Sequence, residues 1–85
     1  MGPQKAVRMP RYFFMVREGD YTSYHSDGIE LPDIGAVQLE ATKSTGELLR
    51  ELDHPIEAGS DWRMEVADEA RRPIFSLHVI AKCHQ

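Results

Sequence analysis

The sequence predicts an α+β fold in the order β-β-α-β-β, in which a four-stranded, mainly antiparallel sheet carries one helix on one face. Near both ends of the chain, apolar residues alternate with other residues, which is the period of a strand. Between these segments, apolar residues recur at spacings of three and four, which is the period of a helix. We expect one α+β domain over residues 9–85.

The first strand is expected at residues 11–17, RYFFMVR, where aromatic and β-branched residues are concentrated. Both of its faces carry apolar side chains, which favours a position in the interior of the sheet. Pro10 precedes the strand, at a place where its missing N–H costs little. Residues 1–8, MGPQKAVR, have no apolar period, and we expect a flexible N-terminal extension there.

A second, shorter strand and the helix follow. The turn signal EGD leads into YTSYHS, which can pair with the first strand. Asp33 is a suitable N-cap because its carboxylate accepts hydrogen bonds from the free N–H groups of a first helical turn. The helix is expected to run from Ile34 to Leu52 or Asp53, because Pro55 biases the residue before it away from helical geometry.

A C-terminal hairpin completes the predicted fold. Residues 61–67, DWRMEVA, alternate cleanly between apolar and polar side chains. Residues 74–81, IFSLHVIA, form the last strand, and DEARRP turns the chain between the two.

The single helix can cover only one face of this sheet. The other face of the predicted strands also carries apolar side chains, and a soluble monomer rarely leaves such a patch open. The candidate protein interface comprises Phe13, Met15, Ile74, His78 and Ile80. We therefore expect the domain to bind a second copy of itself, as a homodimer, or another protein.

Composition limits the class of protein. The chain is 41% hydrophobic and 28% charged, with a net charge of −4, which is ordinary for a globular domain. Its single cysteine, Cys83, excludes an internal disulfide and suits a reducing compartment. No apolar run approaches the roughly 20 residues of a membrane span, and no apolar signal segment precedes Met9. We expect a cytoplasmic protein without a membrane partner.

No residue pattern predicts a catalytic, cofactor-binding or metal-binding site. Cys83 and His84 are adjacent and would point apart in an extended chain, and no Cys-x-x-Cys or His-x-x-x-His spacing occurs. The acidic residues around the second predicted strand do not have the spacing of a calcium loop. We expect neither an enzyme nor a cofactor.

Basic and aromatic residues interleave near the N-terminus, which leaves an alternative open. Arg8, Arg11 and Arg17 are the candidate nucleic-acid contacts, since RNA-binding sheets combine aromatic and basic side chains on a strand. The net negative charge of the rest of the chain opposes binding to a polyanion. Nucleic acid is therefore not the expected partner, and this contact is kept as the alternative to protein binding.

Three segments carry a resemblance to known sequences: MPRYFFMVREGD, DGIELPDIGAVQLEA and WRMEVADEARRPIFSLHV. In this order they resemble a family of small bacterial proteins of unknown function, over residues 9–79. Members typically begin Met-Pro-Arg-Tyr-Phe-Phe, which implies that residues 1–8 are additional. The family usually has glycine after DEA, where this chain has Arg71. If the turn requires a positive φ, Arg71 is strained or the turn type differs.

The ELPD step into the helix is similar to that of HicB-type antitoxins, which share a ββα core. Because the first family has no established activity, the resemblance adds no catalytic residue. The leading hypothesis is a small non-enzymatic interaction or regulatory domain that self-associates or binds a protein. The alternative is an antitoxin-like or nucleic-acid-contacting regulatory module.

Overall fold

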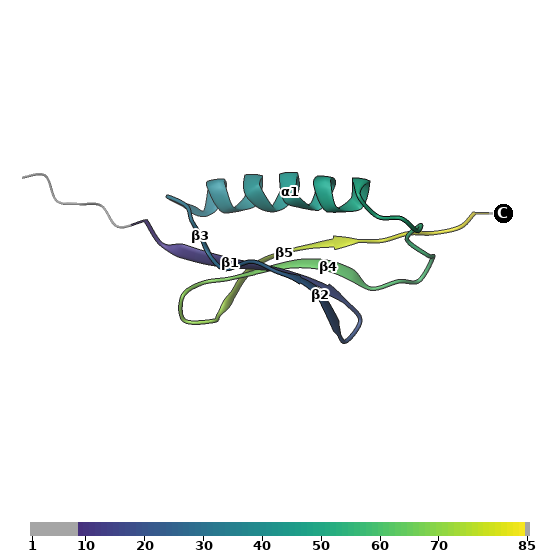
Figure 1. Ribbon diagram of the computed structural model, residues 1–85, viewed down its shortest axis with the longest axis horizontal. Helices are drawn as coiled ribbons and strands as arrows, with labels where there is room; N and C mark the ends of the chain where they lie inside the picture. The colour runs from purple at the N-terminus through teal and green to yellow at the C-terminus, as the bar shows by residue number, and fades with distance from the viewer. Residues whose placement is uncertain (1–8, 85) are drawn as a thin grey trace, which may run out of the picture.

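The computed structural model describes residues 9–84 and has one helix packed on one face of an antiparallel sheet (Figure 1). The predicted Arg8 and the expected extension at residues 1–8 lie outside the described residues. The elements are β1 (Arg11–Glu18), β2 (Tyr21–His25), β3 (Ile29–Glu30), α1 (Ile34–Arg50), β4 (Trp62–Ala67) and β5 (Pro73–Val79). The strand order is β2-β1-β4-β5, and β3 also pairs with β1. The predicted fold class is confirmed, with β3 as an additional short strand.

The core lies between α1 and the central strands β1 and β4. Phe14 and Val16 of β1 are opposite Val66 and Met64 of β4, and all four are buried. Because side chains alternate along a strand, these residues share the face that the helix covers. Val37 of α1 is fully buried on the same side. The predicted interior position of the first strand is therefore confirmed.

Helix α1 begins as the sequence predicts. The Asp33 carboxylate accepts a hydrogen bond of 2.8 Å from the Ala36 N–H, which satisfies one free donor of the first turn. The helix ends at Arg50, before the predicted Leu52 or Asp53. The chain tightens there: the Leu52 N–H donates three residues back, to the Leu49 carbonyl at 3.4 Å.

Ser26 connects β2 to β3 along one edge of β1. The Ser26 N–H donates to the Phe14 carbonyl, and the Phe14 N–H donates to the Ser26 hydroxyl, each at 2.9 Å. Gly28 follows with φ +107°, and a Cβ built there would lie 2.7 Å from Arg11 Cδ. Only glycine tolerates this conformation and this approach without strain. β3, which starts at the next residue, was absent from the sequence prediction because two residues are too short to reveal an alternation.

The turn between β4 and β5 is held by Asp68. Its carboxylate accepts hydrogen bonds of 2.9 Å from the N–H groups of Arg72 and Ala70. The hydrogen bond from the Arg72 N–H is the largest influence on the pKa of Asp68, which lies below its ordinary value. Since the pKa is lowered in the folded state, this stabilisation is present above the ordinary carboxyl pKa and is lost as pH falls through the lowered value.

Arg71 adopts φ 66° in that turn, which is a left-handed conformation. The sequence predicts strain at Arg71 if the turn requires a positive φ, and the turn does require it. Its guanidinium lies 5.2 Å from the centre of the Phe13 ring. The strain at Arg71 is thus partly offset by a cation–π contact with a neighbouring strand.

We expect Ser26→Ala to lower the free energy of unfolding by about 1–3 kcal/mol, because the buried Phe14 N–H then has no acceptor. Urea unfolding followed by circular dichroism measures the change. Ser23→Ala is the matched control, since Ser23 is exposed in β2, and it should change stability by less than about 0.5 kcal/mol. Equal effects of the two substitutions would show that the Ser26 hydroxyl has no special role.

Arg71→Gly and Arg71→Ala should differ in stability. Both remove the contact with Phe13, but only glycine relieves the positive φ. The glycine variant should therefore be more stable than the alanine variant by about 1 kcal/mol. Thermal unfolding of both variants measures this difference, and an alanine variant as stable as the glycine variant would contradict a strained turn.

Candidate functional site

The predicted interface residues lie along the sheet face opposite the helix or beside it. Phe13 and Met15 of β1 and Ile74 of β5 are half-buried, and His78 is exposed. Ile80 follows β5 directly and is 73% exposed. Whether these five residues form an interface remains a prediction.

Charged side chains divide this face. Arg17 of β1 and Arg63 of β4 are directly opposite each other, and both pair with Glu65, at 4.0 and 3.8 Å. Arg63 also pairs with Asp61 at 3.6 Å. The next residue across the sheet from Arg63 is His78. The apolar residues Phe13 and Met15 therefore do not continue across this face into one apolar surface with Ile80.

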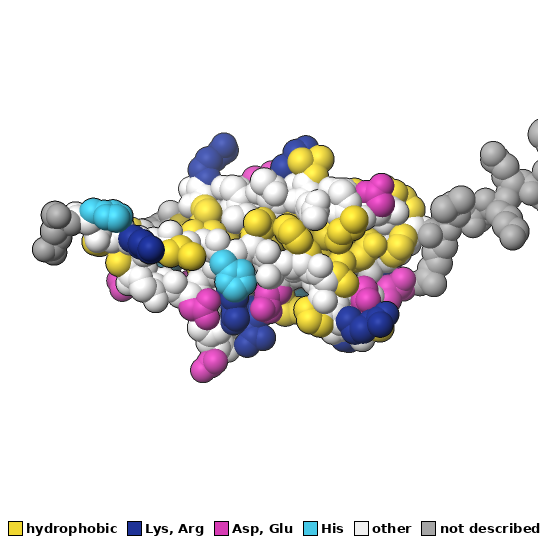
Figure 2. Space-filling view, turned by 180° about the vertical axis from the view of Figure 1, so that it is seen from behind, with side chains coloured by type: hydrophobic (Ala, Val, Ile, Leu, Met, Phe, Trp, Pro, Cys, Tyr) yellow, Lys and Arg dark blue, Asp and Glu magenta, His cyan; other side chains and the backbone are white. Residues whose placement is uncertain are grey.

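The edge of β5 is the longest open edge of the sheet. Within the described residues, β5 pairs with β4 alone, so one side of its backbone has no strand partner. The sequence from Ile74 to Ile80, IFSLHVI, contains no Asp, Glu, Lys or Arg. Phe75, Leu77 and Val79 turn toward the helix side but stay only half-buried. Figure 2 shows apolar side chains gathered in a band along the molecule, on the side away from the viewer of Figure 1.

The opposite edge has a different character. β2 is short, all five of its residues are exposed, and its register with β1 shifts between Val16 and Arg17. Short, polar and irregular edges are the usual devices by which proteins prevent strand addition. β5 has one such irregularity, a register shift beside Ile74 at its Pro73 end, but from Phe75 to Val79 it is regular and uncharged. The two edges of the sheet are therefore unequal, and β5 is the less protected one.

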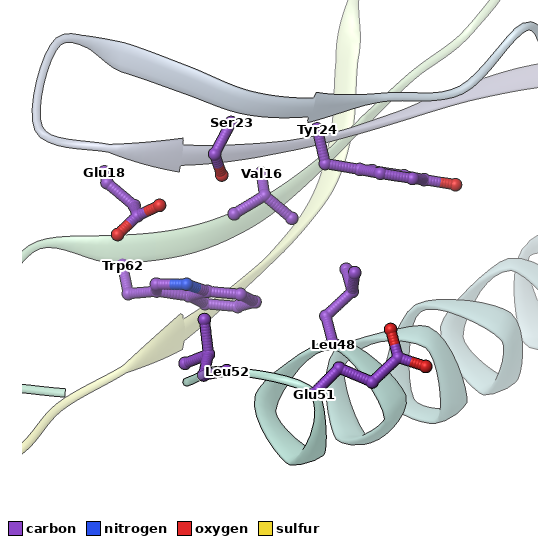
Figure 3. Close-up of a pocket in the computed structure, with 8 residues that line it drawn as sticks. All are labelled: Val16, Glu18, Ser23, Tyr24, Leu48, Glu51, Leu52 and Trp62. Carbon is purple, nitrogen blue, oxygen red and sulfur yellow. The ribbon is translucent and has the colours of Figure 1, made fainter. Parts of the chain in front are cut away.

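A cleft of about 270 Å³ lies between β1, β2, β4 and the C-terminal end of α1 (Figure 3). Its lining residues are Val16, Glu18, Ser23, Tyr24, Leu48, Glu51, Leu52 and Trp62. The Trp62 indole lies across the cleft, between Val16 on the sheet side and Leu52 on the helix side, while Glu18 and Glu51 stand at its two ends. A second hollow of about 200 Å³, near His54 and Ser60, shares Glu18 and Trp62 with the first.

Two polar groups of this cleft lack the partners that their positions call for. Trp62 is only 3% exposed, and its indole N–H has no hydrogen-bond acceptor. Glu18 is directly opposite Trp62 in the β1–β4 register, at the end of the apolar face of β1. Sequence reasoning treated Glu18 as part of a turn and missed this site. The sequence did contain a signal: Glu18 comes two residues after Val16, so the two side chains point to the same face of the strand.

The predicted nucleic-acid contacts do not form one basic surface in the described part. Arg11 pairs with Glu30 at 3.9 Å, and Arg17 pairs with Glu65 on the far part of β1. Between residues 9 and 84, no three His, Cys, Asp or Glu side chains gather as a metal site would require. No helix in that part is long and apolar enough to cross a membrane.

Comparison with known proteins places the chain in a family. No curated protein and no solved structure matches it. Residues 11–81 match the family described as a domain of unknown function, DUF6894. The match covers all six elements of the fold, both edges of the sheet and the cleft. This agrees with the resemblance to an uncharacterised family, and the chain belongs to the DUF6894 family.

Proposed function

We propose that this domain is a non-enzymatic interaction module that forms a homodimer by pairing β5 with β5 of a second copy. The observation that carries the proposal is the pattern IFSLHVI on an open edge strand. From Phe75 to Val79 this strand has no charged residue and pairs with β4 in a regular register, and such an edge is a template for strand addition. A second strand would pair the free backbone groups of this edge and cover its apolar side chains.

The pattern is symmetric in polarity about Leu77. If two copies of β5 pair antiparallel around a two-fold axis at Leu77, apolar residues meet apolar residues and polar residues meet polar ones. The facing pairs are Leu77 with Leu77 of the second copy, Phe75 with Val79, Ile74 with Ile80, and Ser76 with His78. Aromatic–β-branched pairs and hydrogen-bonding pairs are the contacts that stabilise neighbouring strands. Self-complementarity of this kind is what a two-fold interface requires.

The same pairing accounts for the exposed apolar residues near the edge. Ile80 is 73% exposed in the single chain and would lie against Ile74 of the second copy. Phe75, Leu77 and Val79 are half-buried, and the second β5 would extend the apolar layer beneath both helices. Each copy would thereby bury apolar surface, and such burial stabilises a complex by roughly 25 cal/mol for each Å² removed from water. Three of the five predicted interface residues, Ile74, His78 and Ile80, would take part.

Regulation by nucleic-acid binding remains the alternative. It has no support from the separated positions of Arg11 and Arg17, which are each paired with a glutamate. The proposal keeps the non-enzymatic role and the cytoplasmic location that the sequence leads us to expect, and its structural support is the open strand edge.

We expect the purified chain to have the mass of a dimer by size-exclusion chromatography with light scattering. Ser76→Lys combined with His78→Lys should weaken dimerisation by about tenfold or more, because lysines would then face each other twice across the axis. Both positions are exposed, so the fold should be retained. Circular dichroism confirms that the variant is folded.

The control is a charge swap in the same two positions. Ser76→Lys combined with His78→Glu places opposite charges across the axis and should restore the dimer. A monomeric wild-type chain would overturn the proposal. So would a dimer that survives both double variants but is lost in Phe13→Ser, because that result assigns the interface to the opposite sheet face.

A further inference from the structure

We propose that the cleft around Trp62 binds the guanidinium group of an arginine side chain presented by a partner peptide. This goes beyond the proposed self-association, since the cleft lies at β1, β2 and the end of α1 and includes no residue of β5. The inference rests on the shape of the cleft, its charge and an unpaired buried donor.

The cleft is shaped for a side chain with an apolar stem. Val16 and Trp62 are buried, and Leu48 and Leu52 are half-buried beside them. The volume of about 270 Å³ is at the lower limit of small-molecule pockets, which suits one long side chain. Long basic side chains pack their methylene stems on such surfaces while the charged end stays near water.

The charge of the cleft is negative and uncompensated. Glu18 and Glu51 are its ionisable lining residues other than Tyr24, and within residues 9–84 neither forms an ion pair. Glu51 also caps the C-terminal end of α1, where the helix dipole adds partial negative charge. A carboxylate in that position is unfavourable, and Arg50 in the last helical turn forms no ion pair with it among the described residues. The site therefore lacks a positive charge, which a ligand can supply.

The Trp62 indole N–H is the independent sign of an incomplete site. A buried donor without an acceptor is destabilising, so such groups are usually satisfied. Glu18 is its cross-strand neighbour, and an ionised carboxylate has acceptor sites for several donors. A guanidinium bound at Glu18 would hold the Glu18 carboxylate in the cleft. There the carboxylate can also accept a hydrogen bond from the Trp62 indole N–H.

Arginine fits these groups better than lysine does. The guanidinium is planar and stacks on aromatic rings, and the exposed Tyr24 ring lines the cleft. It carries five N–H donors in a fixed plane, so one group can make a two-bond contact with one carboxylate while the second carboxylate adds favourable charge. An ammonium group is a compact point charge and lacks this reach.

The test uses the single tryptophan of the chain, whose indole N–H gives one resonance in an ¹⁵N-correlated NMR spectrum. The probe is N-acetyl-arginine methylamide, titrated into the full-length protein. We expect a saturable shift of the indole resonance that weakens as salt is added. The corresponding citrulline amide has the same shape without charge and should bind about tenfold more weakly.

Variants locate the site. Glu18→Gln and Glu51→Gln should each weaken binding of the arginine amide by about threefold to tenfold, because each removes one charged acceptor. Glu30→Gln is the matched control, since it changes the net charge equally at the far end of β1 and should leave binding unchanged. Backbone amide spectra confirm that the variants are folded.

Two results of the titrations and one result of the variants would overturn the proposal. One is an indole resonance that does not move with the arginine amide, and the other is an equal response to the citrulline amide. A response that persists in the combined Glu18→Gln, Glu51→Gln variant would also overturn it, because binding would then occur elsewhere. None of these outcomes depends on whether the chain forms a dimer.

Discussion

The pair of hydrogen bonds between Ser26 and Phe14 is the constraint on which the rest of the sheet depends. It joins two short strands, β2 and β3, into a nearly continuous partner for one side of β1. Without it, the backbone of β1 would be open where the chain leaves β2, beside the buried Phe14 side chain. With it, β1 is an interior strand, and the chain emerges from β3 in position for Asp33 to start the helix.

This arrangement leaves the protein with one protected edge and one less protected edge. β2 is short and polar, so it ends the sheet on its own side. On the other side, β5 keeps an unpaired backbone and half-buried apolar side chains. The helix packs over the core and also contacts β5, but it lies on the face of the sheet, so the outer backbone edge of β5 stays without a strand partner. The unpaired backbone edge of β5 is therefore a consequence of this small fold.

The sequence predicts the parts of the fold that have a long repeating pattern. β1, β4 and β5 follow from alternation, and the start of α1 follows from Asp33, whose capping bond is local. The short strand β3 and the exact end of α1 depend on contacts with distant residues, so no local pattern predicts them. The cleft was missed for the same reason: Glu18, Glu51 and Trp62 come from separate segments that only the folded chain brings together.

The two proposed surfaces use different residues, and the fold relates them. Pairing of β5 strands about an axis normal to the sheet places both helices on the same side. Each cleft lies next to β1, which is separated from the axis by β4 and β5. At about 4.8 Å between strands, the two clefts would be roughly 25 Å apart. A partner with two suitably spaced arginines could then occupy both clefts, and its second contact would be intramolecular. Self-association would thereby convert one weak contact into a stronger bivalent one, without any further residue in the cleft.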